Sequence, residues 1–124
     1  MSTATSDHTK TLARTYLDSW RARDFDRLRT VLADDVTFHG VLGVATGVEE
    51  VLAGLRGMAE NIMTDIDIQI MVADGPDVLT WFDLHTRTTE PLPTVNWSHV
   101  VDGRIARIRV TFDPRPLFPP EDRS

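Results

Sequence analysis

An acid and an imidazole lie two residues apart in the stretch DVLTWFDLHTRT, residues 77–88 of the chain. Because successive side chains of a β-strand point to opposite faces, Trp81, Asp83 and His85 are expected to share one face. A carboxylate in an apolar cavity has its charged form disfavoured, so it can exchange protons near neutrality. This face therefore suggests acid-base chemistry, with Asp83 as the base and His85 as its proton partner. The alternative is a structural polar pair near the end of a sheet.

A tyrosine hydroxyl is the third candidate catalytic group. Tyr16 falls on the apolar face of a predicted helix, where it could donate a hydrogen bond to a developing oxyanion. The alternative is a core tyrosine whose hydroxyl bonds to a neighbour. Asp113 and His39 are reserve candidates. Asp113 precedes Pro114 where the last predicted strand ends, which favours a turn, and alternation predicts that His39 points away from the face of Phe38.

The sequence predicts neither a metal nor a cofactor. The histidines show no i, i+4 pair or other recognised ligand spacing, and the chain has no cysteine. A glycine-rich phosphate loop and a nucleophile elbow are also missing from the sequence.

Large side chains near these groups are candidates for the wall of a pocket that takes a flat or cyclic hydrophobic ligand. The candidate binding residues are Trp20, Phe38, Trp81, Asn96, Trp97, Val110 and Phe112. Asn96 and Trp97 are neighbours on one predicted strand, so only one of them can face the pocket. For Trp20 and Phe38, ordinary core packing is the alternative.

Two periodicities divide the chain. Apolar residues recur at helical spacing in its first half, where Asp24 can cap a short helix and Thr46 with Glu49 has the spacing of a capping box. Alternation with a period of two follows, and Asp102-Gly103 is a strong hairpin signal. The expected helices span residues 9–20, 25–32 and 46–62, and the expected strands span residues 34–40, 65–72, 77–88, 94–101 and 104–112.

Three helices before a meander of strands predict an α+β fold. The sheet is expected to be a cone-shaped, curved antiparallel sheet packed on three N-terminal helices, with an internal pocket. One domain is expected over residues 1–124, with a flexible start at residues 1–8 and a proline-rich tail at residues 114–124.

Charge and composition limit the partners. Lys and Arg number 13 against 19 Asp and Glu, a formal net charge of -6, which argues against nucleic acid and membrane as partners. Nothing near Met1 resembles a signal peptide, so a cytoplasmic protein is expected. The outer face of the sheet has no helices to cover it, and Arg107, Arg109 and Thr111 alternate there with apolar residues, which predicts a homodimer.

The order of elements also resembles a known family. YLDSWRARDFDRLRTVLADDVTFHG, GVEEVLAGL and VVDGRIARIRVTFDP are similar to the SnoaL-like branch of the nuclear transport factor two-like superfamily over nearly the whole chain. The resemblance implies a cone-shaped pocket. In that superfamily the cone hosts isomerases, dehydratases, polyketide cyclases, epoxide hydrolases and pure binding modules, so it does not fix a reaction.

Comparison with the ketosteroid isomerases of this superfamily places Tyr16 on the position of the oxyanion-hole tyrosine. Gly40 falls where those enzymes have their general-base aspartate, and Trp97 falls near their second acid. In SnoaL-like cyclases an acid near the end of the sheet takes part in the chemistry, which implies a role for Asp113.

Comparison with the limonene-epoxide hydrolases places Asp83 on the catalytic acid and Trp81 on an arginine. Val110 takes the place of the partner aspartate. Both comparisons imply that the face of Trp81, Asp83 and His85 points into the cone. The expected function is a cofactor-independent acid-base enzyme that cyclises, isomerises, dehydrates or opens the epoxide of a small hydrophobic molecule. The alternative is a non-catalytic small-molecule-binding or assembly domain.

Overall fold

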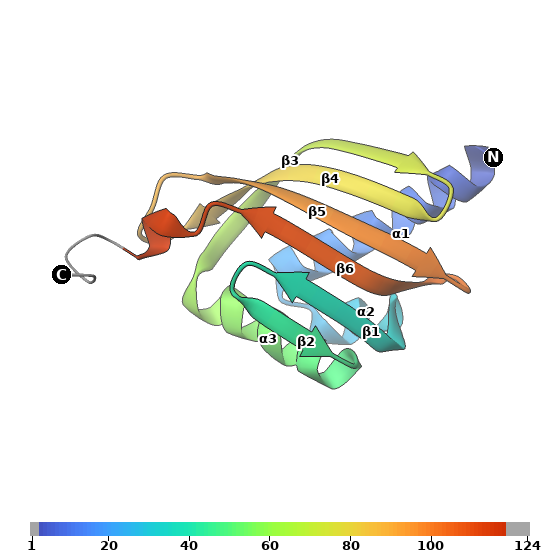
Figure 1. The fold of residues 1–124 in the computed structure, drawn as a ribbon, viewed down its shortest axis with the longest axis horizontal. Helices are drawn as coiled ribbons and strands as arrows, with labels where there is room; N and C mark the ends of the chain where they lie inside the picture. The colour runs from blue at the N-terminus through green and yellow to red at the C-terminus, as the bar shows by residue number, and fades with distance from the viewer. Residues whose placement is uncertain (1–2, 119–124) are drawn as a thin grey trace.

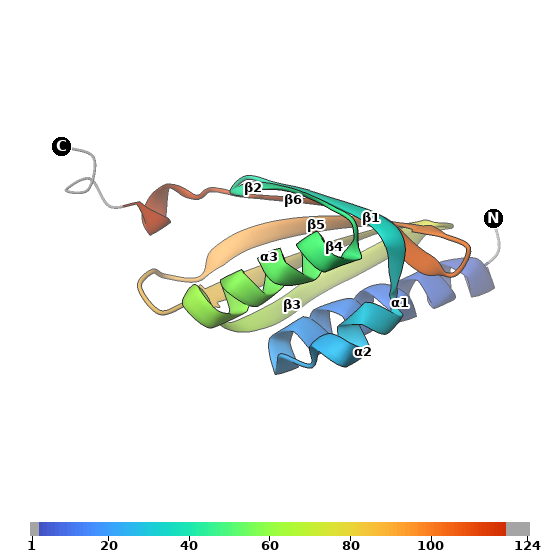
Figure 2. The same ribbon diagram turned by 90° about the horizontal axis from the view of Figure 1, so that it is seen from below.

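The computed structural model describes residues 3–118. The elements in chain order are α1 (Thr3–Ala22), α2 (Phe25–Thr30), β1 (Leu32–Gly40), β2 (Gly43–Thr46), α3 (Val48–Asn61), β3 (Met63–Asp74), β4 (Asp77–Thr86), β5 (Leu92–Val101), β6 (Arg104–Phe112) and a short 3-10 helix (Arg115–Leu117). The predicted α+β class is confirmed, because the three helices pack against one face of a single curved sheet (Figures 1 and 2).

The six strands are ordered β2-β1-β6-β5-β4-β3. Neighbouring strands run antiparallel except β1 and β6, which pair in parallel, with Phe38 opposite Ile108. The prediction of an antiparallel sheet is therefore corrected at this pair. The last strand of the meander from β3 to β6 lies next to β1. There β6 pairs with the edge of β1 that β2 leaves free, and it runs parallel to β1. The strand β2 was not predicted, since four residues are too few to show alternation.

The first helix begins at Thr3, within the segment expected to be a flexible start. Its first turns are tied to the β3–β4 turn. The Gly75 backbone N–H donates to Ser6 Oγ at 3.0 Å, and Thr9 Oγ1 donates to the Gly75 carbonyl oxygen at 2.6 Å. Residues 1–2 of the predicted start and residues 119–124 of the predicted tail lie outside the described part of the chain. No helix among residues 3–118 is both long enough and apolar enough to cross a membrane.

The predicted cap of α2 is confirmed, whereas at the start of α3 a different glutamate from the predicted one makes the capping hydrogen bond. Asp24 caps α2, since its carboxylate accepts from the Arg27 backbone N–H at 3.1 Å. At the start of α3, Glu50 rather than Glu49 accepts from the Thr46 backbone N–H, at 3.0 Å. The carboxylate of Glu49 instead accepts hydrogen bonds from Nη1 and Nη2 of Arg29, and so links α3 to α2.

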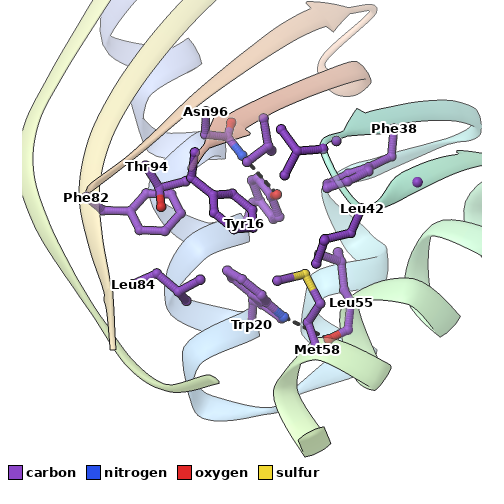
Figure 3. A pocket seen from close by; sticks show the side chains of 15 residues that line it. Tyr16, Trp20, Phe38, Leu42, Leu55, Met58, Phe82, Leu84, Thr94 and Asn96 are labelled. Atoms are coloured by element: carbon purple, nitrogen blue, oxygen red, sulfur yellow. Dashed lines mark hydrogen bonds between the residues drawn. The ribbon is translucent and has the colours of Figure 1, made fainter. Parts of the chain in front are cut away.

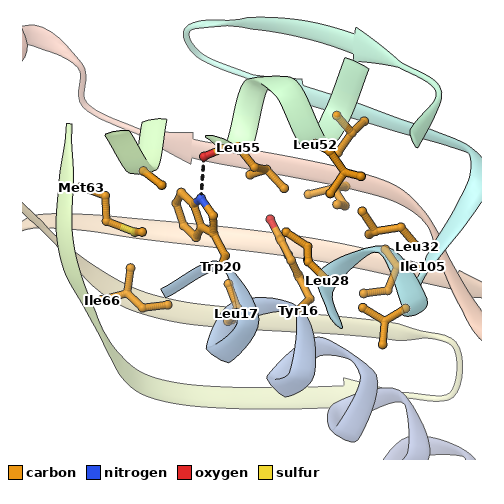
Figure 4. Packing of buried hydrophobic residues seen from close by; sticks show 14 of the residues in the cluster. Tyr16, Leu17, Trp20, Leu28, Leu32, Leu52, Leu55, Met63, Ile66 and Ile105 are labelled. Carbon is orange, nitrogen blue, oxygen red and sulfur yellow. Dashed lines mark hydrogen bonds between the residues drawn. The ribbon is translucent and has the colours of Figure 1, made fainter. Parts of the chain in front are cut away.

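One hydrophobic core lies between the helices and the inner face of the sheet (Figure 4). The largest fully buried side chains are Tyr16, Leu17, Leu28, Leu32, Val36, Val51, Met63, Val78, Phe82, Leu84, Ile105 and Ile108. Trp20 Nε1 donates to the Leu55 carbonyl oxygen at 2.9 Å, which joins α1 to α3. These contacts fix the helices against the sheet and so shape the space between them.

Candidate functional site

An apolar pocket opens between α1, α3, the inner face of β4 to β6 and the tip of the β1–β2 hairpin (Figure 3). The space in it that a water-sized molecule can occupy is about 40 Å³, so lining side chains must move aside for any larger ligand. The lining residues are Tyr16, Trp20, Phe38, Gly40, Val41, Leu42, Gly43, Leu55, Met58, Phe82, Leu84, Thr94, Asn96, Val110 and Phe112. Tyr16, Thr94 and Asn96 supply polar side-chain groups, and Trp20 uses its indole N–H on Leu55.

A chain of hydrogen bonds runs along β5 to the tyrosine of α1. Ser98 Oγ donates to Asn96 Oδ1 at 2.8 Å, and Asn96 Nδ2 donates to the Tyr16 hydroxyl oxygen at 3.0 Å. All three residues are buried. Within residues 3–118, the Tyr16 hydroxyl proton has no acceptor. Each hydrogen bond polarises the next donor, so this relay ends at an O–H group that is free to bond to a molecule in the pocket.

Burial keeps this hydroxyl in its neutral form. Removal from water raises the pKa of Tyr16 above its ordinary value of 10.0, and the hydrogen bond from Asn96 offsets only part of that rise. The phenol therefore keeps its proton at neutral pH. It acts as a hydrogen-bond donor rather than as a base.

The face of β4 that carries Trp81 and Asp83 lies outside the pocket. Trp81 is 47% exposed, and Asp83 accepts a hydrogen bond from Gln69 of β3 at 3.4 Å on the outer surface. The expectation that this face points into the cone is wrong. The opposite face, with Phe82 and Leu84, faces the pocket and is buried. Each Å² of apolar surface removed from water contributes about 25 cal/mol, which favours this face over one that buries a carboxylate.

His85 is also separated from the pocket. It lines a shallow polar depression between α1 and β3, where Arg14, Asp18 and Asp65 are its neighbours. No hydrogen bond joins His85 to Asp83 in the described structure. The predicted base and its proton partner therefore lie on the surface and do not reach a molecule held beside Tyr16.

The predicted wall residues divide in the same way. Trp20, Phe38, Asn96, Val110 and Phe112 line the pocket. The other member of the Asn96 and Trp97 pair faces outward.

Trp97 is held on the outer face by several contacts. Its Nε1 donates to Asp77 Oδ1 at 2.9 Å, and the guanidinium carbons of Arg107 and Arg109 lie 5.2 Å and 5.9 Å from its ring. The same Asp77 oxygen lies 2.7 Å from His99 Nδ1. Desolvation raises the pKa of Asp77, but the hydrogen bonds from Trp97 and His99 and the nearby charges together outweigh it, so the pKa is lowered.

The sequence from residue 13 to residue 108 matches a family described as "SnoaL-like domain". This segment covers most of the chain, including α3, the second half of α1 and most of the sheet. The chain belongs to the SnoaL-like domain family. The resemblance found in the sequence is confirmed.

Solved structures with the same fold differ in what they do. An LEH-like epoxide hydrolase from M. tuberculosis shares 25% identity with this SnoaL-like domain, with a TM-score of 0.77 over 91% of this chain and 88% of the other. An NTF2-like protein of unknown function from Cytophaga hutchinsonii shares 24% identity, with a TM-score of 0.80 over 90% and 95%. A de novo designed protein with a curved β-sheet shares 17%, with a TM-score of 0.79 over 93% and 90%.

Among curated protein sequences, none matches the chain. The fold occurs in an enzyme, in a protein of unknown function and in a designed protein. The function of this SnoaL-like domain must therefore be argued from its own pocket.

The two reserve candidates of the SnoaL-like domain also lie outside the pocket lining. His39 borders a depression on the outer face of the sheet, on the side away from Phe38, as alternation predicts. Asp113 is exposed, and its carboxylate accepts three side-chain hydrogen bonds and one backbone N–H hydrogen bond from Arg115. These hydrogen bonds lower the pKa of Asp113 to about 2. The residue closes the turn after β6.

Several pocket residues were missed in the sequence. Leu55 and Met58 have helical spacing on the inner face of α3, but nothing in the sequence separates a pocket-lining residue from a core residue there. Thr94 and Ser98 share the strand parity of Asn96, which could have pointed to the relay. Within the described residues, no cluster of three or more His, Cys, Asp or Glu could hold a metal ion.

Proposed function

We propose that this SnoaL-like domain binds a small apolar molecule that carries a hydrogen-bond-accepting oxygen, and that it does so without catalysing a reaction. The observation that carries the proposal is that the O–H of the buried Tyr16 has no hydrogen-bond acceptor among residues 3–118. The surrounding wall is apolar, so it favours hydrocarbon over water. A carbonyl or ether oxygen placed against Tyr16 would satisfy the one polar group that the relay leaves open.

The pocket offers no group for acid-base chemistry. A general base must lie within about 3 Å of the proton that it abstracts, directly or through one water. The described pocket lining contains no carboxylate and no imidazole. At Gly40, a Cβ atom would lie 2.9 Å from Cε1 of the Phe38 ring, so that ring occupies the space where a side chain would begin. The acid-base enzyme expected from Asp83 and His85 therefore has little support, and the binding alternative is favoured.

Replacing Tyr16 with Phe should abolish the preference for an oxygen-bearing ligand. Acetophenone and ethylbenzene have nearly the same shape, but only acetophenone has a carbonyl oxygen. We expect the native protein to prefer acetophenone by about 0.5–1.5 kcal/mol, or roughly threefold to tenfold. The Tyr16→Phe variant should bind both compounds alike. Isothermal titration calorimetry with the two compounds measures this difference.

Asp83→Asn serves as the control for this experiment, because it changes a charge on the opposite face of the same sheet. We expect this variant to keep the native preference. A preference that survives in Tyr16→Phe would mean that a donor other than the Tyr16 hydroxyl, such as the Asn96 amide N–H, binds the ligand oxygen. Conversion of a bound compound into product would contradict the non-catalytic proposal.

We also propose that the domain assembles as a homodimer through the outer face of its sheet. Four large apolar side chains of β3 and β4 are between 46% and 59% exposed there, namely Ile70, Val72, Leu79 and Trp81, which we call the outer patch. On this outer face the acidic Asp67 and Asp83 lie on β3 and β4. The basic Arg107 and Arg109 lie on β6, with β5 between the two sets. A two-fold axis would place each set opposite its counter-charge.

Leu79→Asp should weaken this dimer at the centre of the outer patch. Burying an unpaired carboxylate in an apolar contact costs at least about 2 kcal/mol, or roughly a 30-fold increase in the dissociation constant. Light scattering at micromolar concentration should give a dimer mass for the native protein and a lower mass for the variant. Phe118→Asp, an equally exposed residue off the sheet, should not change the mass. A monomer mass for the native protein would refute the proposal.

A further inference from the structure

A second apolar hollow adjoins the pocket between β2 and α3. The two share five residues of the β1–β2 hairpin and of α3, namely Phe38, Leu42, Gly43, Leu55 and Met58 (Figure 3). The space in this groove that a water-sized molecule can occupy is about 200 Å³. The pocket and the groove therefore adjoin, and the same side chains of the hairpin and of α3 border both.

The chemistry of the groove is uniformly apolar. Its described lining has no charged residue and no polar side chain. Val44 stands at its rim and is 66% exposed, and Leu42 is 43% exposed. Apolar surface left open to water is stabilised when hydrocarbon covers it.

Gly54 leaves the helical side of the groove open. It lines the groove, and a Cβ atom added there would meet no heavy atom within 4 Å. Almost any other residue on this turn of α3 would project a side chain into that space. Gly57 has equally open surroundings but lines neither the pocket nor the groove.

We propose that the groove receives the aliphatic tail of the ligand whose oxygen bonds to Tyr16. The ligand class is then a long-chain aliphatic carbonyl compound, with its head in the pocket and its tail between β2 and α3. This inference rests on the proposed function for the head, and on the shared lining for the tail. Met58 and Leu42 are the side chains that turn aside when the tail passes, because both are flexible and line both spaces.

Chain length and two glycine substitutions test this assignment. Butanone and methyl nonyl ketone share one head and differ in the tail. Each methylene that enters the groove should tighten binding roughly fourfold. Gly54→Leu, which fills the groove, should weaken the binding of methyl nonyl ketone by at least about tenfold and leave the affinity for butanone unchanged. Gly57→Leu makes the same change on the same helix outside the groove, and both ketones should bind it as they bind the native protein.

The outcomes separate the tail from the head. Equal weakening of both ketones by Gly54→Leu, or no weakening of either, overturns the groove assignment. If Tyr16→Phe weakens the binding of both ketones while Gly54→Leu weakens the binding of neither, the proposed function stands and the groove assignment fails. If only Gly54→Leu acts, and only on the long ketone, the groove assignment stands and the contact with Tyr16 fails. Failure of both ketones to bind the native protein overturns both.

Discussion

Trp20→Ala should lower the free energy of unfolding by about 3–5 kcal/mol, as large-to-small changes of a buried tryptophan do. Trp20 is 4% exposed, and it joins three parts of the structure. Its ring packs in the core between α1 and the sheet, it borders the pocket, and its Nε1 donates to the Leu55 carbonyl oxygen of α3. The substitution leaves a cavity, and it also removes the donor of the hydrogen bond to the Leu55 carbonyl oxygen that joins α1 to α3. Chemical denaturation followed by far-ultraviolet circular dichroism measures the loss.

Trp81→Ala is the matched control, since both tryptophans were candidates for the pocket wall in the sequence. Trp81 is 47% exposed on the outer face, so its loss should change the stability of the monomer by no more than about 0.5 kcal/mol. Measuring both variants over a range of protein concentrations separates the two effects, because a loss of dimer contacts depends on concentration and a core cavity does not. Equal losses in the two variants would contradict the assignment of core and surface.

The direction of β4 shows where sequence reasoning succeeded and where it failed. Alternation correctly divided the strand into two faces, one with Phe82 and Leu84 and the other with Trp81 and Asp83. It could not say which face is buried. Family resemblance favoured the face with the acid, whereas burial of apolar area selects the other. The apolar character of Phe82 and Leu84 is visible in the sequence and predicts the buried face correctly, whereas the comparison with enzymes of the superfamily does not.

The strand β3 failed for a different reason. Ile66, Ile68, Ile70 and Val72 alternate perfectly in the sequence, a pattern that predicts one shared buried face. A bulge between Ile68 and Ile70 shifts the register, so that Ile70 lies opposite Trp81 on the outer face. One inserted residue turns every later side chain to the other side. No pattern in the sequence marks this bulge, and it creates much of the exposed apolar outer patch.

Of the three predicted catalytic residues, Tyr16 is the one that the structure places in the pocket, and helical periodicity is sufficient to predict its inward face. Its partner Asn96 was assigned to the pocket wall, but the hydrogen bond between them joins residues 80 positions apart. Such a contact depends on how α1 lies across the sheet. Helical and strand periods predict which face each residue occupies, and they do not predict which faces meet.

Alkaline pH should destabilise the protein through Tyr16. Burial raises the pKa of this hydroxyl above 10.0 in the folded state, and the unfolded chain keeps the ordinary value. Below pH 10 both states hold the proton, and the contribution of Tyr16 to stability is fully present. Above pH 10 the unfolded state loses its proton first, so stability falls by about 1.4 kcal/mol per pH unit until the folded pKa is reached. Two pH units above 10, the expected loss is about 2–3 kcal/mol.

The composition of the chain makes this effect separable. Tyr16 is its one tyrosine, so tyrosinate absorbance in the near ultraviolet reports on this hydroxyl alone. We expect that absorbance to appear together with unfolding rather than before it, because the folded state withholds the proton. In Tyr16→Phe the stability should decline less steeply above pH 10, and the difference between the two proteins isolates the tyrosine from other titrating groups. Tyrosinate absorbance that rises near pH 10 while the circular dichroism stays native would show that water reaches the hydroxyl. The relay from Ser98 through Asn96 would then not hold Tyr16 as a buried neutral donor.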